Sequence, residues 1–149
     1  MKKIFLVVLI SQLPVQAISY SISSEVPYRK NLNNSIRSLN PRIGYKAFTY
    51  KKDGAEINII WDTVNTSIFG YIEPGEPCII HITPSTLVFN GKQIDKDFIS
   101  VMGLHELGHC IGLEHNDNPD SIMYAHPLPN TKILKSDIED IKQVLNSAL

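Results

Sequence analysis

Residues 105–115 read HELGHCIGLEH, with the spacing H-E-x-x-H-x-x-G-x-x-H, and SIMY follows at residues 121–124. Two histidines four residues apart project from the same face of an α-helix, so His105 and His109 can both reach one metal ion. Five fixed positions, each met by chance about one time in twenty, arise in such a chain on the order of once in ten thousand sequences or less often. The spacing therefore indicates a metal site rather than coincidence.

The third histidine of this stretch requires the chain to turn back. On one straight helix, His115 would lie about 15 Å along the axis from His105, too far for one ion with zinc–nitrogen bonds of about 2 Å. Gly112 stands where the turn is needed, since glycine adopts positive φ without steric cost and often ends a helix. We therefore expect a helix that starts near Asp97, carries the first two histidines and is followed by a reversal at Gly112.

The residue types in the motif suit catalysis. Three neutral imidazoles fill three positions of a tetrahedral zinc ion and leave the fourth for water, which is the arrangement of catalytic zinc sites. Glu106 directly follows a ligand, so its carboxylate can take the proton of the activated water and later pass it to a leaving amine. The motif predicts one catalytic zinc ion, with His105, His109 and His115 as ligands and Glu106 as general base.

The composition of the whole chain limits the other possibilities. It has 149 residues, of which 43% are apolar, and this is ordinary for one globular domain. The formal net charge is −1, and no run of Lys and Arg is long enough to form a phosphate-binding stripe. We therefore expect no nucleic-acid partner.

The first residues predict export from the cytoplasm. Lys2 and Lys3 precede an apolar run at residues 4–10, and Val15-Gln16-Ala17 has the small-residue ending of a signal-peptide cleavage site. The run is too short to span a bilayer. We predict a signal peptide at residues 1–17 and one catalytic domain at residues 18–149, secreted or periplasmic and without a stable membrane anchor.

Hydrophobic patterns predict the remaining elements. A helix at residues 27–39 is expected to end at an Asn-Pro pair. A Lys-Asp-Gly turn at residues 52–54 is a hairpin signal between the first two strands. Ser136 and Glu139 have the spacing of a capping box at the start of a last helix. The expected strands are residues 43–50, 56–61, 67–72 and 78–82, and the expected last helix is residues 137–146.

These motifs make the chain similar to the metzincins, zinc endopeptidases that share the long histidine motif and a Met-turn beneath the metal, which Met123 matches. Among metzincins the sequence resembles the matrixins: HELGHCIGLEH is like their HE-L-G-H-x-L-G-L-x-H, and SIMY is like their S-x-M-Y. Residues 134–144 (LKSDIEDIKQV) and 55–61 (AEINIIW) are similar to their last helix and to one of their strands. Asn116 departs from the pattern, because matrixins usually carry serine after the third histidine.

The resemblance implies an α+β fold of the metzincin, or zincin-like, type, with a twisted, mostly parallel sheet, an active-site helix and a C-terminal helix. A peptide would lie extended against the edge strand, residues 67–72. The residues after Met123 would form the wall of the main specificity pocket, and Asp137 would anchor the Met-turn. The residues that the resemblance implies for substrate binding are Phe69, Gly70, Tyr71, Tyr124 and His126.

The function expected from the motif and the resemblance is that of a secreted zinc metalloendopeptidase. Such a hydrolase would cut peptide or protein substrates, and we expect it to act as a monomer with one zinc ion. The alternative is a zinc-stabilised module that binds peptides without proteolysis. Glu106 favours the enzyme, because metal binding alone does not need this carboxylate whereas peptide hydrolysis does.

The two cysteines and one further histidine are open to structural readings. Cys78 and Cys110 could pair in an exported protein, or they could be two small buried residues. Because Cys110 lies inside the expected helix, we predict that they are not bonded. We expect His81, in an apolar strand, to be a packed histidine rather than a ligand, and we expect no second zinc site and no calcium loop.

Overall fold

The computed structural model describes residues 16–65, 67–89, 92–93 and 96–148. The predicted signal peptide, residues 1–17, lies outside the described residues except for its last two. Among the described residues, no helix combines the length and the apolar character that crossing a membrane needs.

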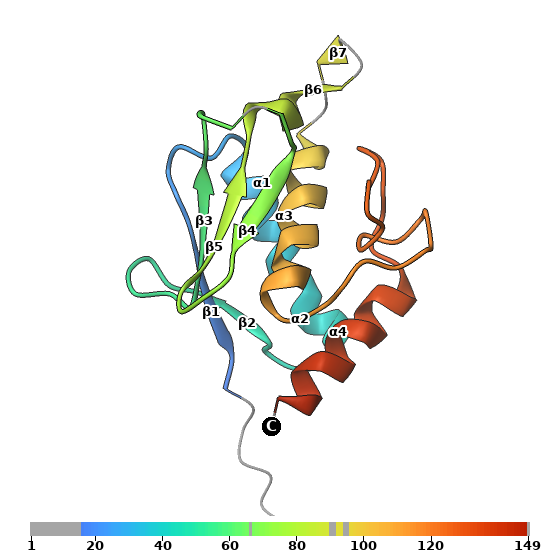
Figure 1. Cartoon of the computed structure of the whole chain (residues 1–149). Helices are drawn as coiled ribbons and strands as arrows, with labels where there is room; N and C mark the ends of the chain where they lie inside the picture. The colour runs from blue at the N-terminus through green and yellow to red at the C-terminus, as the bar shows by residue number, and fades with distance from the viewer. Residues whose placement is uncertain (1–15, 66, 90–91, 94–95, 149) are drawn as a thin grey trace, which may run out of the picture.

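Five strands form one sheet in the order β2-β1-β3-β5-β4 (Figure 1). β4 (Gly70–Glu73) is antiparallel to β5 and pairs on one side only, so it is an edge strand, as the matrixin resemblance implied. The other four strands run parallel to one another, which confirms the expected mostly parallel sheet. They are β1 (Ile18–Ile22), β2 (Phe48–Tyr50), β3 (Ile57–Trp61) and β5 (Cys78–Ile82).

The helix that carries the histidine motif packs against the sheet and against another helix. α3 (Asp97–Cys110) contacts β4 and β5, and it also contacts α1 (Arg29–Arg37), which itself contacts β2 (Figure 1). Gly103 of α3 permits the close contact with α1, because a Cβ at this position would clash with the side chain of Leu32. A 3-10 helix, η1 (Pro84–Leu87), and the two-stranded β6 (Val88–Phe89) and β7 (Lys92–Gln93) lead from β5 to α3.

The hairpin predicted at residues 52–54 is wrong. β2 and β3 lie on either side of β1 and parallel to it, so the turn joins two strands that do not pair. β1 reads ISYSI, and the sequence analysis did not identify it as a strand. Its serines bond to β3 and to the residue before it: Ser21 Oγ donates to Asn58 Oδ1 (2.6 Å) in β3, and Ser19 Oγ donates to Oε2 of Glu56 (2.7 Å), which directly precedes β3. These bonds hold β1 in the place that a hairpin partner would occupy.

The helix predicted over residues 27–39 is divided in two. α1 ends at Arg37, and a short α2 (Leu39–Ile43) runs through the Asn-Pro pair that was expected to end the first helix. Pro41 is tolerated because it lies in the first turn of α2, where a backbone N–H is not needed for the helical ladder.

Asn40 of α2 limits the second strand. Its Oδ1 accepts hydrogen bonds from the backbone N–H groups of Ala47 and Phe48, and its Nδ2 donates to the Phe48 carbonyl, all at 2.9 Å. The side chain thereby satisfies backbone groups that an additional strand would use. The strand predicted over residues 43–50 is accordingly restricted to Phe48–Tyr50.

The prediction that the cysteines are not bonded is also wrong. Cys78 and Cys110 form a disulfide with their Cα atoms 6.0 Å apart. Cys110 is the last residue of α3 and Cys78 is the first residue of β5, so the bond fastens the end of the motif helix to the sheet. A position inside a helix did not exclude pairing, because the helix ends beside its partner strand.

Replacing both cysteines by alanine is expected to lower the free energy of unfolding by about 2–4 kcal/mol, because a cross-link over 32 residues restricts the unfolded chain. Urea unfolding of the oxidised protein and of the Cys78→Ala/Cys110→Ala variant measures this difference. Thiol titration of the denatured, unreduced protein is the control, and two free thiols would contradict the pairing.

Candidate metal centre

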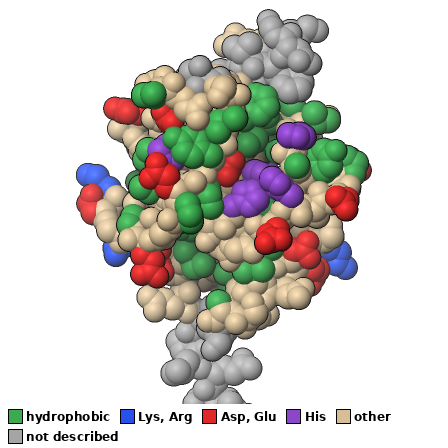
Figure 2. Space-filling view, in the orientation of Figure 1, with side chains coloured by type: hydrophobic (Ala, Val, Ile, Leu, Met, Phe, Trp, Pro, Cys, Tyr) green, Lys and Arg blue, Asp and Glu red, His purple; other side chains and the backbone are tan. Residues whose placement is uncertain are grey.

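Three histidine side chains converge at the surface of α3. The distance between the Nε2 atoms is 3.2 Å for His105 and His109, 3.1 Å for His109 and His115, and 3.3 Å for His105 and His115. Among the described residues, these three form the group of His, Cys, Asp and Glu side chains that could hold a metal ion. Figure 2 shows the histidines gathered at the centre of one face, with Lys and Arg only at its edges.

The triangle of nitrogens fits a tetrahedral zinc ion. Zinc–nitrogen bonds of about 2.0–2.1 Å at tetrahedral angles place neighbouring ligand nitrogens about 3.3–3.4 Å apart, close to the distances found here. A nitrogen set of neutral imidazoles is also among the sets that zinc prefers. The residues present therefore suit zinc, with one coordination position left for a small molecule.

Two of the three rings are held in the tautomer that metal binding needs. Nδ1 of His105 lies 2.6 Å from the Ile122 carbonyl, and Nδ1 of His109 lies 2.8 Å from the Leu113 carbonyl. A carbonyl only accepts hydrogen bonds, so each Nδ1 carries the proton and each Nε2 lone pair is free. Burial also lowers the pKa of His105 to about 4, which keeps its ring neutral near neutral pH.

The reversal after α3 occurs where glycine predicted it. α3 ends at Cys110, and Gly112 has a φ of 103°, in the region that favours glycine. The N–H of Leu113 donates to the Gly108 carbonyl (2.9 Å) and the N–H of Gly112 donates to the His109 carbonyl (3.0 Å). These bonds satisfy carbonyls at the end of the helix, and they turn the chain so that His115 returns to the other two histidines.

Glu106 lies beside the histidines in a closely packed position. It is 4% exposed, and this burial raises the pKa of its carboxyl to about 7. β4 approaches it at Gly70, where a Cβ would lie 3.2 Å from Glu106 Oε1 and 3.0 Å from the His81 carbonyl. The absence of a side chain at Gly70 therefore lets the edge strand pass directly beside the carboxylate.

The burial of Glu106 predicts a pH-dependent effect of Glu106→Gln on metal-free protein. Between its ordinary pKa of 4.5 and the raised value of about 7, the folded state keeps a proton that the unfolded chain releases, so rising pH destabilises the fold. Because glutamine does not ionise, it lacks this penalty. The free energy of unfolding of the variant should therefore be higher than that of wild type by roughly 1–3 kcal/mol at pH 8, and by much less at pH 5. Urea unfolding with a chelator at both pH values measures the difference.

The lowered pKa of His105 acts in the opposite direction, because the unfolded chain takes up a proton below its ordinary pKa of 6.5. This term is present in both proteins and cancels in the comparison. A difference between variant and wild type that did not change between pH 5 and pH 8 would contradict a buried, proton-binding Glu106.

The predicted Met-turn lies beneath the histidines. Met123 is buried, and a Cβ added at Gly108 of α3 would clash with its Sδ. The carbonyl of the preceding residue, Ile122, is the group that accepts the hydrogen bond from His105 Nδ1. The turn is therefore in direct contact with the helix and with one of the three rings.

Asp137 anchors this turn, as the matrixin resemblance implied. Its carboxylate is 1% exposed and accepts hydrogen bonds from Ser121 Oγ (2.5 Å) and from the backbone N–H of Ile122 (3.3 Å). It also accepts one from the backbone N–H of Leu134 (2.7 Å), where the last helix begins. One buried carboxylate thus joins the last helix to the turn that supports His105.

The start of the last helix differs from the predicted capping box. α4 spans Lys135–Ser147, and Ser136 and Glu139 are exposed rather than paired as a cap. The reciprocal bond to the N-cap backbone comes instead from Asp137, at the third position of α4. An aspartate reaching back in this way satisfies an N–H group that the helix leaves free.

Asp137→Ala is expected to cost more stability than the roughly 1 kcal/mol of an ordinary cap, because it also frees two groups of the Met-turn. A loss of about 3 kcal/mol and a weaker hold on zinc are expected, since His105 depends on this turn. Chemical unfolding and zinc titration measure the two effects. Ser136→Ala, one residue earlier and exposed, is the control, and equal small losses in both variants would contradict the anchoring role.

A cleft runs from the histidines along β4. It is lined by Glu106 and the three histidines, by the edge strand, and by the segment after the Met-turn. Among the residues predicted to bind substrate, Phe69, Gly70, Tyr71 and His126 line this cleft. Tyr124 is not among the residues that line the cleft, although the next residue, Ala125, is.

The sequence analysis missed a polar cluster behind the edge strand. Tyr71 donates from its hydroxyl to Asp62 Oδ2 (2.8 Å) and stacks on the ring of His81 with ring centroids 4.2 Å apart. His81 lies 3.5 Å from Asp62 and 3.1 Å from Glu73. The backbone hydrogen bond from Val64 and then the bond from the Tyr71 hydroxyl lower the pKa of Asp62. The same bond to Asp62 raises the pKa of Tyr71. His81 is packed as predicted, and the cross-strand pair Tyr71–His81 ties β4 to β5.

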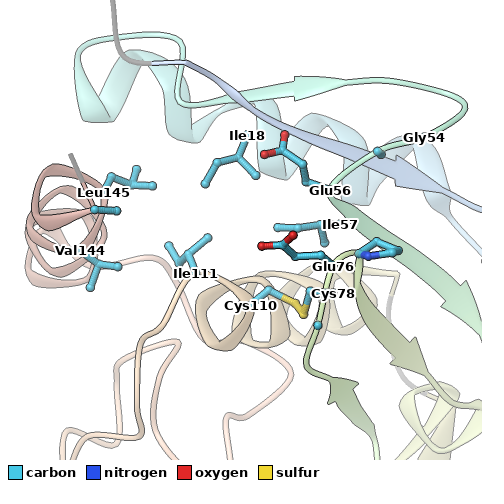
Figure 3. Close-up of a pocket in the computed structure, with 14 residues that line it drawn as sticks. Ile18, Gly54, Glu56, Ile57, Glu76, Cys78, Cys110, Ile111, Val144 and Leu145 are labelled. Atoms are coloured by element: carbon cyan, nitrogen blue, oxygen red, sulfur yellow. A yellow bond between two sulfur atoms is a disulfide. The ribbon is translucent and has the colours of Figure 1, made fainter.

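A second hollow lies on another part of the molecule (Figure 3). It is walled by Ile18, the disulfide and the apolar side chains of α4, with the carboxylates of Glu56 and Glu76 directed toward it. None of the histidines or the other predicted site residues lines it. The cleft beside α3 is therefore the candidate site.

Comparison with known proteins agrees with this geometry. A model of the matrixin peptidase family (Peptidase_M10) matches residues 89–146. Matrilysin from Felis catus is 37% identical over 59 residues, which cover 37% of this chain and 22% of that protein. Human matrix metalloproteinase-15 is 32% identical over 60 residues, which cover 38% of this chain and 9% of that protein. The match thus spans less than a quarter of either curated relative.

The mostly parallel sheet, the motif helix and the three converging histidines define a metzincin-like fold. Within that class the chain is matrixin-like, since residues 89–146 match the model of the matrixin family, and the two relatives carry the names matrilysin and matrix metalloproteinase-15. The matched segment contains α3, the reversal at Gly112, the Met-turn and most of α4.

Proposed function

We propose that the protein is a secreted zinc-dependent metalloendopeptidase. The observation that carries the proposal is the triangle of Nε2 atoms with sides of 3.1–3.3 Å, next to a buried Glu106 and an edge strand. Neutral imidazoles, a carboxylate and a free strand edge are together what peptide hydrolysis at zinc requires. The match to the matrixin family and the similarity to a protein named matrix metalloproteinase-15 support the same assignment.

His105, His109 and His115 would hold the ion through Nε2. When bound, zinc supplies a Lewis acid that lowers the pKa of a water molecule and polarises the scissile carbonyl. Glu106 takes a proton from the attacking water and gives it to the departing amine nitrogen when the C–N bond breaks. Its burial favours this exchange, because a carboxylate with few water contacts takes up a proton more readily than an exposed one.

β4 would hold the substrate by pairing with an extended peptide, since backbone groups along an edge strand are free to accept another strand. Gly70 and Tyr71 of β4 supply this edge, Phe69 lies directly before it in the cleft wall, and Gly70 brings the scissile bond close to Glu106. His126, which lines the cleft, and Tyr124, which does not line it but directly precedes the lining segment after the Met-turn, complete the proposed substrate-binding set. We further propose export through a signal peptide at residues 1–17 and a monomeric enzyme at residues 18–149, with one zinc ion and no nucleic-acid or membrane partner.

A zinc-stabilised module that binds peptides without cutting them is the second candidate. It would use the same histidines and the same edge strand, but it would not need Glu106. The buried position of Glu106 beside the histidines disfavours this candidate, because a buried carboxylate without a role costs stability.

Two substitutions separate metal binding from proton transfer. His115→Ala should lose zinc and activity together, since two remaining imidazoles make a poor site. Glu106→Gln should keep one zinc per chain, because the amide fills the same space, while hydrolysis falls by the roughly 10²–10⁴-fold typical of a lost general base, or by more. Zinc content by elemental analysis and cleavage of a peptide library by mass spectrometry measure the two properties.

Wild-type protein with a chelator, and then with zinc restored, is the control for these variants. A Glu106→Gln protein that cut peptides at the wild-type rate would contradict the proposed chemistry. Tight binding of zinc and peptide by the wild type, with no cleavage across the library, would favour the binding module.

A further inference from the structure

His115 lacks the support that the other two rings have. Nδ1 of His105 and Nδ1 of His109 each donate to a backbone carbonyl. For His115, the recorded hydrogen-bond contacts within the described residues are those of Nε2 to the other two rings. The side chain is also exposed. Its position therefore depends on the backbone that carries it rather than on a partner of its ring.

That backbone is fixed at the next residue. The N–H of Asn116 donates to the Met123 carbonyl (3.0 Å), and its side-chain Nδ2 donates to Ser121 Oγ (2.9 Å). Its Oδ1 accepts the N–H of Asn118 (3.1 Å). The side-chain amide of Asn116 thus bonds within the loop, through Asn118, and also bonds to Ser121 of the Met-turn.

The bond to Ser121 completes the hydrogen bonding of that hydroxyl. Ser121 Oγ donates its one proton to Asp137 and accepts from the N–H of Met123 (3.0 Å) and from Asn116 Nδ2. A hydroxyl has one donor and two acceptor positions, and all are used. A continuous chain of hydrogen bonds therefore runs from Asp137 of α4, through Ser121, to the residue beside His115.

We propose that Asn116 is a positioning residue for the third metal ligand. It holds the backbone of His115 at the distance from α3 at which Nε2 meets the other two nitrogens, a task that carbonyl groups perform for His105 and His109. This inference rests on the proposed zinc site, and the side chain acts through Ser121 rather than by touching metal or substrate.

Asn116→Ala should weaken zinc binding by about 10- to 100-fold, the range found when groups that orient metal ligands are removed. Competition with a chromophoric chelator measures the dissociation constant. The thermal midpoint of the metal-free variant should stay within about 2 °C of wild type, since a partly exposed loop contact contributes little to global stability. The stabilisation added by zinc should then be smaller than in wild type at equal zinc concentration.

Asn118→Ala is the matched control. Asn118 is an asparagine in the same loop whose Oδ1 accepts the N–H of Asp120 (3.1 Å) and no other hydrogen bond from the part of the chain that the structure describes. Its side chain makes no hydrogen bond to Ser121, and the bond from the Ser121 N–H to the Asn118 backbone carbonyl (3.0 Å) is kept in the alanine variant. The substitution should therefore leave the zinc dissociation constant within about twofold of wild type. Equal zinc affinities for Asn116→Ala and Asn118→Ala would overturn the proposal.

A double-mutant cycle tests the route through Ser121. If Asn116 acts through that hydroxyl, Asn116→Ala should weaken zinc binding far less in a Ser121→Ala background than in wild type. If the two losses of zinc affinity are fully additive, the route through Ser121 is overturned. It is also overturned if Asn116→Ala lowers the thermal midpoint of the metal-free protein by clearly more than about 2 °C, because the loss of affinity would then follow from a general loss of stability. Failure of the wild type to bind zinc would instead contradict the proposed function, so the two failures are distinct.

Discussion

The buried carboxylate of Asp137 is the interaction on which the metal centre depends. It satisfies the N-cap of α4 and, from the same two oxygens, holds Ser121 and Ile122 of the Met-turn. The Ile122 carbonyl in turn fixes the ring of His105. A charge buried this deeply is tolerated only where hydrogen bonds replace its hydration, and these bonds are the ones that join the last helix to the site.

Much of this arrangement could be predicted, because the relevant signals are local. The histidine spacing required a helix and a reversal, and the helix and a positive φ at Gly112 are both present. Strands β3 (INIIW) and β5 (CIIHI) are mostly apolar, as expected of strands in the interior of a parallel sheet. The roles of Glu106 and of the three histidines remain predictions, although the geometry brings their side chains together.

What the sequence did not indicate involves residues far apart in the chain. β1 was not recognised, since its five residues carry two serines and their partners lie 37 residues away. The Lys-Asp-Gly sequence at residues 52–54 is typical of a hairpin turn, but β1 lies between the two strands that this turn joins. The sequence of a turn does not show that a third strand, from another part of the chain, pairs with both. The disulfide was wrongly predicted to be absent for a related reason, because its formation depends on where the end of α3 lies relative to β5.

The disulfide has a consequence for the motion of α3. The last turn of a helix usually frays, because its carbonyls lack partners, and His109 lies in that last turn. Here Cys110 is bonded to the first residue of β5, in the interior of the sheet order. Local opening of the turn that carries His109 is therefore opposed by the sheet, so its amide protons should share the slow hydrogen exchange of β5 rather than the fast exchange of a helix end.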